Sequence, residues 1–261
     1  MIRPKVLVAA PTFDGMKYCE KEFFDRIKSL DYPGYDVLIV DNSRNLDYFN
    51  ELRKIWDITV IHDHSDEEKS VFRLISSRNL ILEYAIAKDY SHVLMLDSDV
   101  IPPKNVIQEL LACDKDIVSG LYYNFFVVSG QKKWLPVAWK LLTVEEFSEL
   151  QKIPSYSSLS RSDLRRHITP EEIDSGAVLE VNLPSAGCML ISRDVFLDLR
   201  YGKFSSNGGA DDDRFFIDQA FNAGFVPFCN PKVLCDHLVK EKYVDDGKGN
   251  LVHKSFSDMI K

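Results

Sequence analysis

Short runs of apolar residues alternate with segments of helical periodicity through the first half of the chain. The runs have the length of strands, whereas the segments between them place apolar residues three and four positions apart, as one face of a helix does. The runs predict strands at residues 6–10, 36–40, 58–62, 92–96 and 117–121. The intervening segments predict helices at 19–30, 48–56, 76–87 and from the Pro102–Pro103 pair to about residue 112. Apolar strands separated by helices predict an α/β fold whose sheet is mostly parallel, with helices on both faces.

The regular pattern breaks down after residue 121 and returns in the final third. In between, Thr143 and Thr169 each precede a glutamate by three positions, which is the capping-box signature of a helix start. A serine-rich loop at 155–162 separates these two helix starts. Later segments predict a strand at 188–192, a helix at 213–223 and a strand at 232–235. We therefore predict a single domain over residues 1–261, with halves at 1–120 and 121–240 and a C-terminal tail or lid at 241–261.

Composition places the chain among ordinary globular proteins. Its 261 residues are 45% hydrophobic and 28% charged, which is enough for a buried core. Lysine and arginine total 32 against 40 for aspartate and glutamate, a formal net charge of −8. A protein that binds nucleic acid phosphates carries a basic surface, so we expect no nucleic acid partner.

The cysteines and the apolar segments bear on the compartment. The five cysteines are scattered and form no Cys-x-x-Cys pair, so neither a disulfide framework nor a zinc ribbon is indicated. The apolar run near the N-terminus ends early, at Pro11 and Asp14, and we interpret it as a first strand rather than a signal peptide. No stretch approaches the roughly 20 apolar residues of a transmembrane helix. We expect a protein of the reducing cytoplasm with no transmembrane segment.

Carboxylates follow three of the predicted strands. Asp14 comes after the first, Asp41 after the second, and Asp97 and Asp99 after the fourth. Ligands of parallel sheets bind beyond the carboxyl ends of the strands, so these residues are candidates for a site. Side chains two positions apart in an extended chain face the same way, and two such carboxylates repel unless a cation lies between them. Asp97 and Asp99 therefore predict a Mn²⁺ or Mg²⁺ site, although a lone aspartate after a strand is ordinary turn chemistry.

Four segments, taken in order, resemble a known family. They are Val8–Phe13, Tyr32–Ser43, Ser77–Asn79 and Leu96–Asp99. They look like the successive motifs of GT-A fold glycosyltransferases, particularly the family-2 type, over roughly residues 4–120. The resemblance implies a GT-A fold, in which a Rossmann-like nucleotide-binding half precedes an acceptor-binding half. It also implies a hexosyltransferase type of activity that uses a nucleoside-diphosphate sugar. A UDP-sugar is slightly favoured over a GDP-sugar, and the acceptor, whether sugar, lipid-linked or protein, is not identified.

The resemblance assigns roles to individual residues. Thr12 and Phe13 would lie beside the base, Asp41 would hydrogen-bond to the base, and Arg78 would lie near the base or a phosphate. Asp97 would reach toward the ribose and the metal, and Asp99 would bind the metal. A metal that bridges two phosphates would stabilise the departing nucleoside diphosphate as a Lewis acid. The whole donor site would comprise Pro11, Thr12, Phe13, Asp41, Arg78, Asp97 and Ser98.

A second match lies in the last third of the chain. Gly187–Arg193 resembles the family's small-residue strand, and Asp211–Phe216 with Gly224 resembles its acidic pair and helix. The alignment puts Asp212 and Asp213 on the acidic pair, where the family usually has a glutamate first. Asp213 shares the apolar stripe of the predicted helix, so we expect it to point inward and act as the catalytic base. Helix capping is the alternative explanation for these acids.

Histidines supply two further candidates. His237 follows the last predicted strand, at about the place where a histidine completes the metal site of several GT-A enzymes. The resemblance therefore makes His237 a metal ligand, and a merely hydrogen-bonded histidine is the alternative. His62–His64 with Asp66 has a metal-like composition but follows the third strand, away from the motif carboxylates. We interpret that segment as a solvated loop.

These features predict metal-dependent glycosyl transfer, in which Asp213 acts as base if the reaction inverts the sugar configuration; the stereochemistry stays open. A second interpretation is a haloacid-dehalogenase-type phosphohydrolase, because Val93–Val100 resembles the first motif of that class, with Asp97 as the nucleophile. About 90 residues of patterned chain precede that motif, which normally opens its domain. A third interpretation is a nucleotide-sugar-binding module without turnover.

Overall fold

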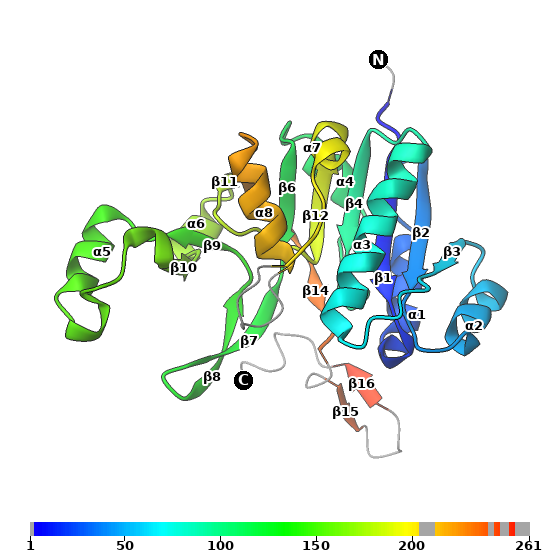
Figure 1. Ribbon diagram of the computed structural model, residues 1–261, viewed down its shortest axis with the longest axis horizontal. Helices are drawn as coiled ribbons and strands as arrows, with labels where there is room; N and C mark the ends of the chain where they lie inside the picture. Colours follow the sequence, from blue (N-terminus) through cyan, green and yellow to red (C-terminus); the bar gives the residue numbers. More distant parts are fainter. Residues whose placement is uncertain (1–2, 204–211, 240–242, 246–250, 254–261) are drawn as a thin grey trace.

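The computed structural model describes residues 3–203, 212–239, 243–245 and 251–253 (Figure 1). Its centre is an eight-stranded sheet with the strand order β11-β13-β6-β12-β4-β1-β2-β3. In chain order these strands are β1 (Val6–Thr12), β2 (Tyr35–Asp41), β3 (Thr59–His62), β4 (His92–Leu96), β6 (Ile117–Leu121), β11 (Leu179–Glu180), β12 (Cys188–Ser192) and β13 (Pro227–Leu234). The α/β fold predicted from the apolar runs is confirmed.

The sheet is mostly parallel, as predicted. β1 runs parallel to β2 and β4, β2 to β3, and β13 to β6. β12 runs antiparallel to both of its neighbours, and the short β11 is antiparallel to β13. The carboxyl ends of β1, β2 and β4 therefore meet at one edge of the sheet, the lower edge in Figure 1. The first residue of β12, Cys188, joins them there because it pairs with Leu96.

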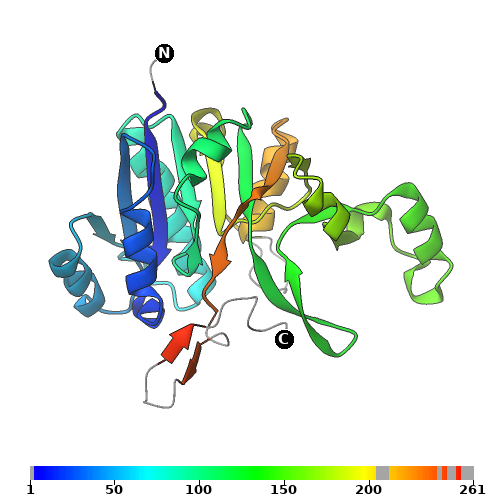
Figure 2. The same cartoon turned by 180° about the vertical axis from the view of Figure 1, so that it is seen from behind.

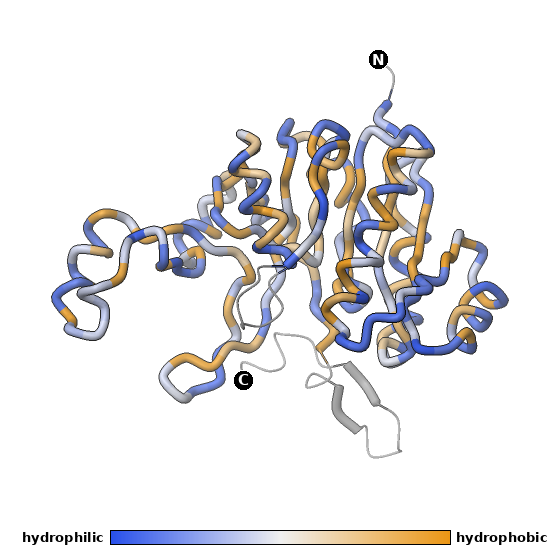
Figure 3. Tube along the Cα trace, in the orientation of Figure 1, coloured by the Kyte–Doolittle hydropathy of each residue, from blue (hydrophilic) through white to orange (hydrophobic). Residues whose placement is uncertain are grey.

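Helices cover both faces of the sheet, and each face has its own core (Figures 1 and 2). Phe24 and Leu110 belong to one core, and Leu82 and Phe196 belong to the other. Figure 3 shows the apolar residues concentrated on the central strands and the helix faces against them. One core is covered by α1 (Glu20–Ile27), α2 (Asp47–Ile55) and α4 (Val106–Leu111), and the other by α3 (Ser70–Ala87), α7 (Arg193–Asp198) and α8 (Asp212–Asn222).

A less regular part of the chain projects from this body (Figure 1). Its two α-helices begin as predicted, because Thr143 and Thr169 each form a complete capping box. The serine-rich loop contains two short 3-10 turns, η2 (Pro154–Tyr156) and η3 (Arg161–Asp163). The remaining elements are the hairpin β7 (Tyr123–Val128) and β8 (Gln131–Pro136), the ribbon β9 (Trp139–Leu141) and β10 (Arg165–His167), and the helices α5 (Val144–Gln151) and α6 (Pro170–Asp174).

Two helix starts differ from the prediction. α3 begins at Ser70, six positions before the predicted start, and its N-cap residue Lys69 makes no side-chain cap hydrogen bond, so no capping signal marks the start. The Pro102–Pro103 pair lies before α4 rather than in its first turn, because the chain first makes the short strand β5 (Val100–Ile101). The hairpin β7–β8 was not predicted; its turn residues Ser129 and Gly130 both have positive φ, at 52° and 76°.

The C-terminal region is described in part. Beyond β13, strand β14 (Asp236–His237) pairs with β5, and β15 (Tyr243–Asp245) pairs with β16 (Leu251–His253). The rest of the predicted tail or lid, at 240–242, 246–250 and 254–261, lies outside the described residues. Among the helices that are described, none combines the length and the apolar character needed to cross a membrane.

A buried and an exposed leucine near the same helix test the packing. Leu52 in α2 is fully buried, whereas Leu46, the N-cap residue of α2, is 46% exposed. Leu52→Ala is expected to lower the free energy of unfolding by about 2–5 kcal/mol, because it leaves a cavity in a closed core. Leu46→Ala should change it by no more than about 0.5 kcal/mol. Urea denaturation followed by circular dichroism measures both, and equal losses would contradict the described packing of α2.

Candidate active site

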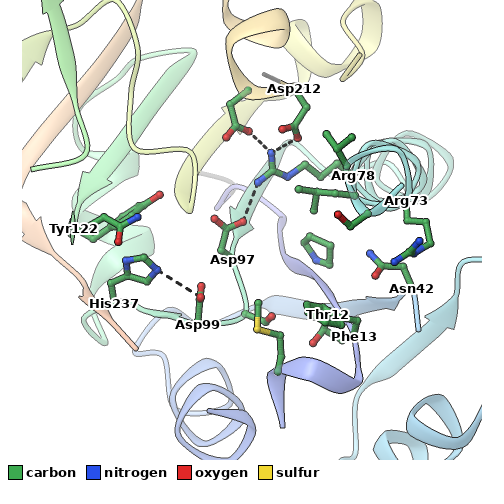
Figure 4. A pocket seen from close by; sticks show the side chains of 18 residues that line it. Thr12, Phe13, Asn42, Arg73, Arg78, Asp97, Asp99, Tyr122, Asp212 and His237 are labelled. Atoms are coloured by element: carbon green, nitrogen blue, oxygen red, sulfur yellow. Dashed lines mark hydrogen bonds and ion pairs between the residues drawn. The ribbon is translucent and has the colours of Figure 1, made fainter. Parts of the chain in front are cut away.

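A cavity of about 440 Å³ opens at the edge where β1, β2 and β4 end (Figure 4). That volume is within the roughly 300–1,000 Å³ typical of small-molecule sites. Its walls come from the strand ends, the N-terminal half of α3, the first turn of α8 and the short strand β14. Residues far apart in sequence meet there, among them Thr12, Asn42, Arg78, Asp97, Asp212 and His237.

Arg78 stands at the middle of the cavity wall and binds three carboxylates. Its side chain, on α3, is only 2% exposed. Nη2 donates to Oδ1 of Asp97 at 2.9 Å, and Nη1 donates to Oδ2 of Asp212 at 2.6 Å and to Oδ1 of Asp213. One guanidinium thus joins the end of β4 to the first turn of α8, two segments more than 100 positions apart.

The three carboxylates keep Arg78 charged despite its burial. Burial alone would lower the pKa of the guanidinium, but Asp213, Asp97 and Asp212 raise it well above its ordinary value. The ring of Tyr201 adds a cation–π contact, with its centroid 5.1 Å from the guanidinium carbon. Removing the Arg78 cation from this buried cluster would leave its three carboxylates without a compensating charge.

The acidic pair at the start of α8 is arranged differently from the prediction. Asp212, not Asp213, is the more buried carboxylate, and it shares a helix face with buried Phe216 four positions on. The Asp213 side chain is 35% exposed and lines the cavity. Desolvation raises the pKa of the Asp213 carboxyl to about 7; Arg78 opposes the rise, and the charges of Asp212 and Asp97 add to it. Because its side chain is partly exposed and lines the cavity, Asp213 is the carboxylate of the pair that can reach a ligand.

Asp99 and His237 meet on the other side of the cavity. Nε2 of His237 lies 3.5 Å from Oδ2 of Asp99. The pairing of β14 with β5 brings the histidine to this position, and its Nδ1 is 3.0 Å from the carbonyl oxygen of Tyr123. Nδ1 can donate to that carbonyl, which leaves Nε2 directed at Asp99. Burial would lower the pKa of His237, but the hydrogen bond and the charge of Asp99 raise it overall.

Asp97 and Asp99 form ion pairs with different residues in the described part of the chain, although both line the cavity. The chain is not extended here, because residues 97–100 form a turn in which the Val100 amide donates to the Asp97 carbonyl at 3.0 Å. Asp97 is directed at Arg78, and Asp99 is directed at His237 (Figure 4). Gly187 leaves room for the second Asp97 oxygen, since a Cβ at that position would lie 2.8 Å from it.

The donor set can be tested against a divalent cation. Within the described residues, no three His, Cys, Asp or Glu side chains are grouped as a metal site. Asp99 and His237 nevertheless offer an oxygen and a nitrogen at 3.5 Å, close to the roughly 3–3.5 Å that separates adjacent ligands of one ion. The described cavity lining also contains four aspartates against two arginines, so a cation there is electrostatically favoured. Two protein ligands fit an ion whose other positions are filled by a bound ligand and water.

Asp41 does not reach the cavity. Its carboxylate is fully buried, with Oδ1 accepting from the Ser43 hydroxyl at 2.6 Å and Oδ2 lying 2.8 Å from Nδ1 of His62. Asn42, the next residue, lines the cavity instead. Strand alternation explains the exchange, because Leu38 and Val40 pack in the core on the α3 face, and Asn42 continues that set.

The segment interpreted as a solvated loop is partly structural. His62 binds Asp41, and Asp63 is buried and accepts hydrogen bonds from the hydroxyls of Ser76 and Ser77 on α3. His64 and Asp66 are exposed, as the solvated-loop interpretation requires. The remaining predicted donor residues, Pro11, Thr12, Phe13 and Ser98, all line the cavity.

Comparisons with known proteins bear on the fold. No model of a protein family matches the chain, and no curated protein matches it. Among solved structures, mannosyltransferase PcManGT from Pyrobaculum calidifontis, determined with GDP-Man and Mn²⁺, superposes with a TM-score of 0.52 at 18% identity. The match covers 92% of this chain but only 59% of the mannosyltransferase chain. Protein A197 from STIV superposes with a TM-score of 0.47 at 14% identity, covering 96% of this chain and 94% of that one. The fold is consistent with the GT-A type.

The raised pKa of Asp213 predicts a pH-dependent contribution to stability. The folded state holds the Asp213 proton more tightly than the unfolded chain, where the carboxyl titrates near 3.8. The contribution of Asp213 to the free energy of unfolding therefore falls as the pH rises from about 4 to 7. Asp213→Asn should remove this part of the pH slope. Asp218→Asn is the matched control, because Asp218 lies on the same helix and is 36% exposed but pairs with Arg214. Urea titrations at several pH values measure the slopes, and an unchanged slope in Asp213→Asn would contradict the assignment.

Proposed function

We propose that the protein is a metal-dependent glycosyltransferase that takes its sugar from a nucleoside-diphosphate sugar. The observation that carries the proposal is a single cavity at the carboxyl edge of a GT-A-like sheet, which contains a metal-competent pair, Asp99 with His237, and a partly exposed carboxylate, Asp213. The solved mannosyltransferase of similar fold, which binds GDP-Man and Mn²⁺, supports it. The proposal includes the likeness of this chain to the family-2 type of GT-A glycosyltransferase.

The donor would lie along the cavity. Its base would sit at the end lined by Pro11, Thr12, Phe13 and Asn42, and its diphosphate would extend toward Asp99 and His237. Because the described lining is acidic, a diphosphate there would need a divalent cation to offset the repulsion. When bound, Mn²⁺ or Mg²⁺ would act as a Lewis acid on the departing nucleoside diphosphate. Asp99 and His237 would hold the ion, with the second oxygen of Asp97 toward it.

Arg78 takes a different role in this proposal from the one the resemblance implied. Its two terminal nitrogens already donate to Asp97, Asp212 and Asp213, so it positions these carboxylates rather than holding base or phosphate. Asp213, partly exposed and with a raised pKa, would accept the proton from the acceptor hydroxyl. Asp212, buried behind it, would hold the start of α8 in place.

Metal-enhanced nucleotide binding tests the donor site. Calorimetry with UDP and with GDP, each with and without Mn²⁺, should show binding of at least one nucleotide that strengthens with the metal. His237→Ala should weaken the metal-dependent part about tenfold or more, because one ligand is lost. His64→Ala serves as the control, since this histidine is exposed and does not line the cavity. Absence of binding by both nucleotides, with or without metal, would refute the donor site.

Asp213→Asn tests the base. The substitution keeps the shape of the side chain and removes its proton acceptor, so turnover should fall roughly 10²-fold or more while nucleotide affinity stays close to wild type. Release of UDP or GDP from nucleotide sugars measures turnover. A variant that retains most of its turnover would leave Asp213 as a helix cap, and lost nucleotide binding would make it part of the donor site.

Incubation with nucleotide sugars and with p-nitrophenyl phosphate separates the alternative functions. A phosphohydrolase with Asp97 as nucleophile would release phosphate from p-nitrophenyl phosphate and leave nucleotide sugars intact. A binding module would bind nucleotide sugars and turn over neither substrate. The proposed transferase should consume a nucleotide sugar in a metal-dependent way and leave p-nitrophenyl phosphate unchanged.

A further inference from the structure

A chain of hydrogen bonds behind the cavity fixes the orientation of the Asn42 amide. Nδ2 of Asn42 lies 3.0 Å from the hydroxyl oxygen of Ser77 on α3. The same hydroxyl lies 2.8 Å from Oδ2 of Asp63 and 2.9 Å from the carbonyl oxygen of Arg73. Asn42, Ser77 and Asp63 are all buried. These three side chains therefore have little access to water, and their polar atoms depend on one another for hydrogen bonds.

The number of hydrogens in this chain decides which atom of Asn42 faces Ser77. A serine hydroxyl has one hydrogen to donate, and both the Asp63 carboxylate and the Arg73 carbonyl can only accept it. Because the Ser77 hydrogen is donated to one of these two oxygens, the Ser77 oxygen can only accept a hydrogen bond from Asn42. The NH₂ group of Asn42 must therefore point at Ser77, because a carbonyl oxygen placed there would have no hydrogen to bind.

The Asp63 end of this series of hydrogen bonds is held as firmly as the Asn42 end. Oδ1 of Asp63 accepts from the hydroxyl of Ser76 at 3.1 Å and from the backbone amide of Ser65 at 3.0 Å. The Asp63 carboxylate is thus bound through both oxygens and cannot turn away from Ser77. The relay Asp63–Ser77–Asn42 leaves Oδ1 of Asn42, with no hydrogen bond from the described residues, as the acceptor available to a ligand in the cavity that Asn42 lines (Figure 4).

We propose that Oδ1 of Asn42 reads the base of the nucleotide by accepting a hydrogen bond from a ring N–H. This inference rests on the proposed function and narrows its substrate class. Uracil carries such a hydrogen at N3 and guanine at N1, whereas cytosine and adenine have a lone pair at the equivalent ring nitrogen. An acceptor whose orientation is fixed repels that lone pair. The site therefore takes a uracil or guanine nucleotide and rejects a cytosine or adenine one.

Equilibrium binding of UDP, GDP, CDP and ADP in the presence of Mn²⁺ tests the proposal on the full chain. Wild type should bind UDP or GDP at least about tenfold more tightly than both CDP and ADP, since one mismatched polar contact at a buried site costs about that much. If no nucleotide binds, the proposed function fails and this inference fails with it. If CDP or ADP binds as tightly as UDP and GDP, the inference alone is wrong.

Ser77→Ala tests the relay itself. Without the Ser77 oxygen the amide of Asn42 is free to turn and present its NH₂ group, so the preference for UDP or GDP over CDP and ADP should fall toward one. Ser76→Ala is the matched control: this neighbouring serine also binds Asp63 but does not touch Asn42, and the wild-type preference should persist. A Ser77→Ala variant that keeps the wild-type preference would overturn the proposal.

A second variant protects the test against misfolding. If Ser77→Ala does not fold, Asn42→Ala removes the acceptor directly. Its affinity for UDP or GDP should fall about tenfold, while its affinity for CDP and ADP should change by less than about threefold. Equal losses for all four nucleotides would also overturn base reading by Asn42, because a merely structural role would weaken them alike.

Discussion

One buried guanidinium holds the cavity edge of the sheet together. Arg78 binds Asp97 at the end of β4 and Asp212 and Asp213 at the start of α8, so the position of α8 depends on a residue of α3. The attraction is strong because the Arg78 side chain is almost completely removed from water. The cavity wall is consequently preformed, and its partly exposed carboxylate, Asp213, is held where a ligand would meet it.

The residues on either side of Arg78 extend this control. Ser77 fixes the amide of Asn42. Asn79 donates to the carbonyl oxygen of Tyr201 at 3.0 Å and accepts from its backbone amide at 2.8 Å, which places the tyrosine ring beside the guanidinium. Consecutive helical side chains point about 100° apart, so these three neighbouring residues of α3 reach three different segments of the chain. One turn of one helix thus sets the geometry of most of the site.

Much of the fold, but less of the site, could be predicted from the sequence. Apolar runs and helical periodicity located the main strands of the sheet. The rule of strand ends pointed to Asp97 and Asp99, and the family resemblance pointed to His237; all three line one cavity. Local pattern could not decide between Asp41 and Asn42, because adjacent strand residues face opposite sides and only the placement of α3 shows which side holds the site. The three-carboxylate partnership of Arg78 was equally invisible, because it depends on how α3 and α8 pack.

The central claim is that this acidic, preformed cavity binds a nucleoside diphosphate together with a divalent cation. A crystal structure grown with Mn²⁺ and whichever of UDP and GDP binds, with anomalous data to locate the metal, tests it most directly. The account predicts a manganese peak against Asp99 and His237, with the nucleotide base at Asn42 and Arg78 still bound to its carboxylates. Manganese and nucleotide bound elsewhere, or a nucleotide in the cavity whose diphosphate is held by Arg78 with no metal, would contradict it.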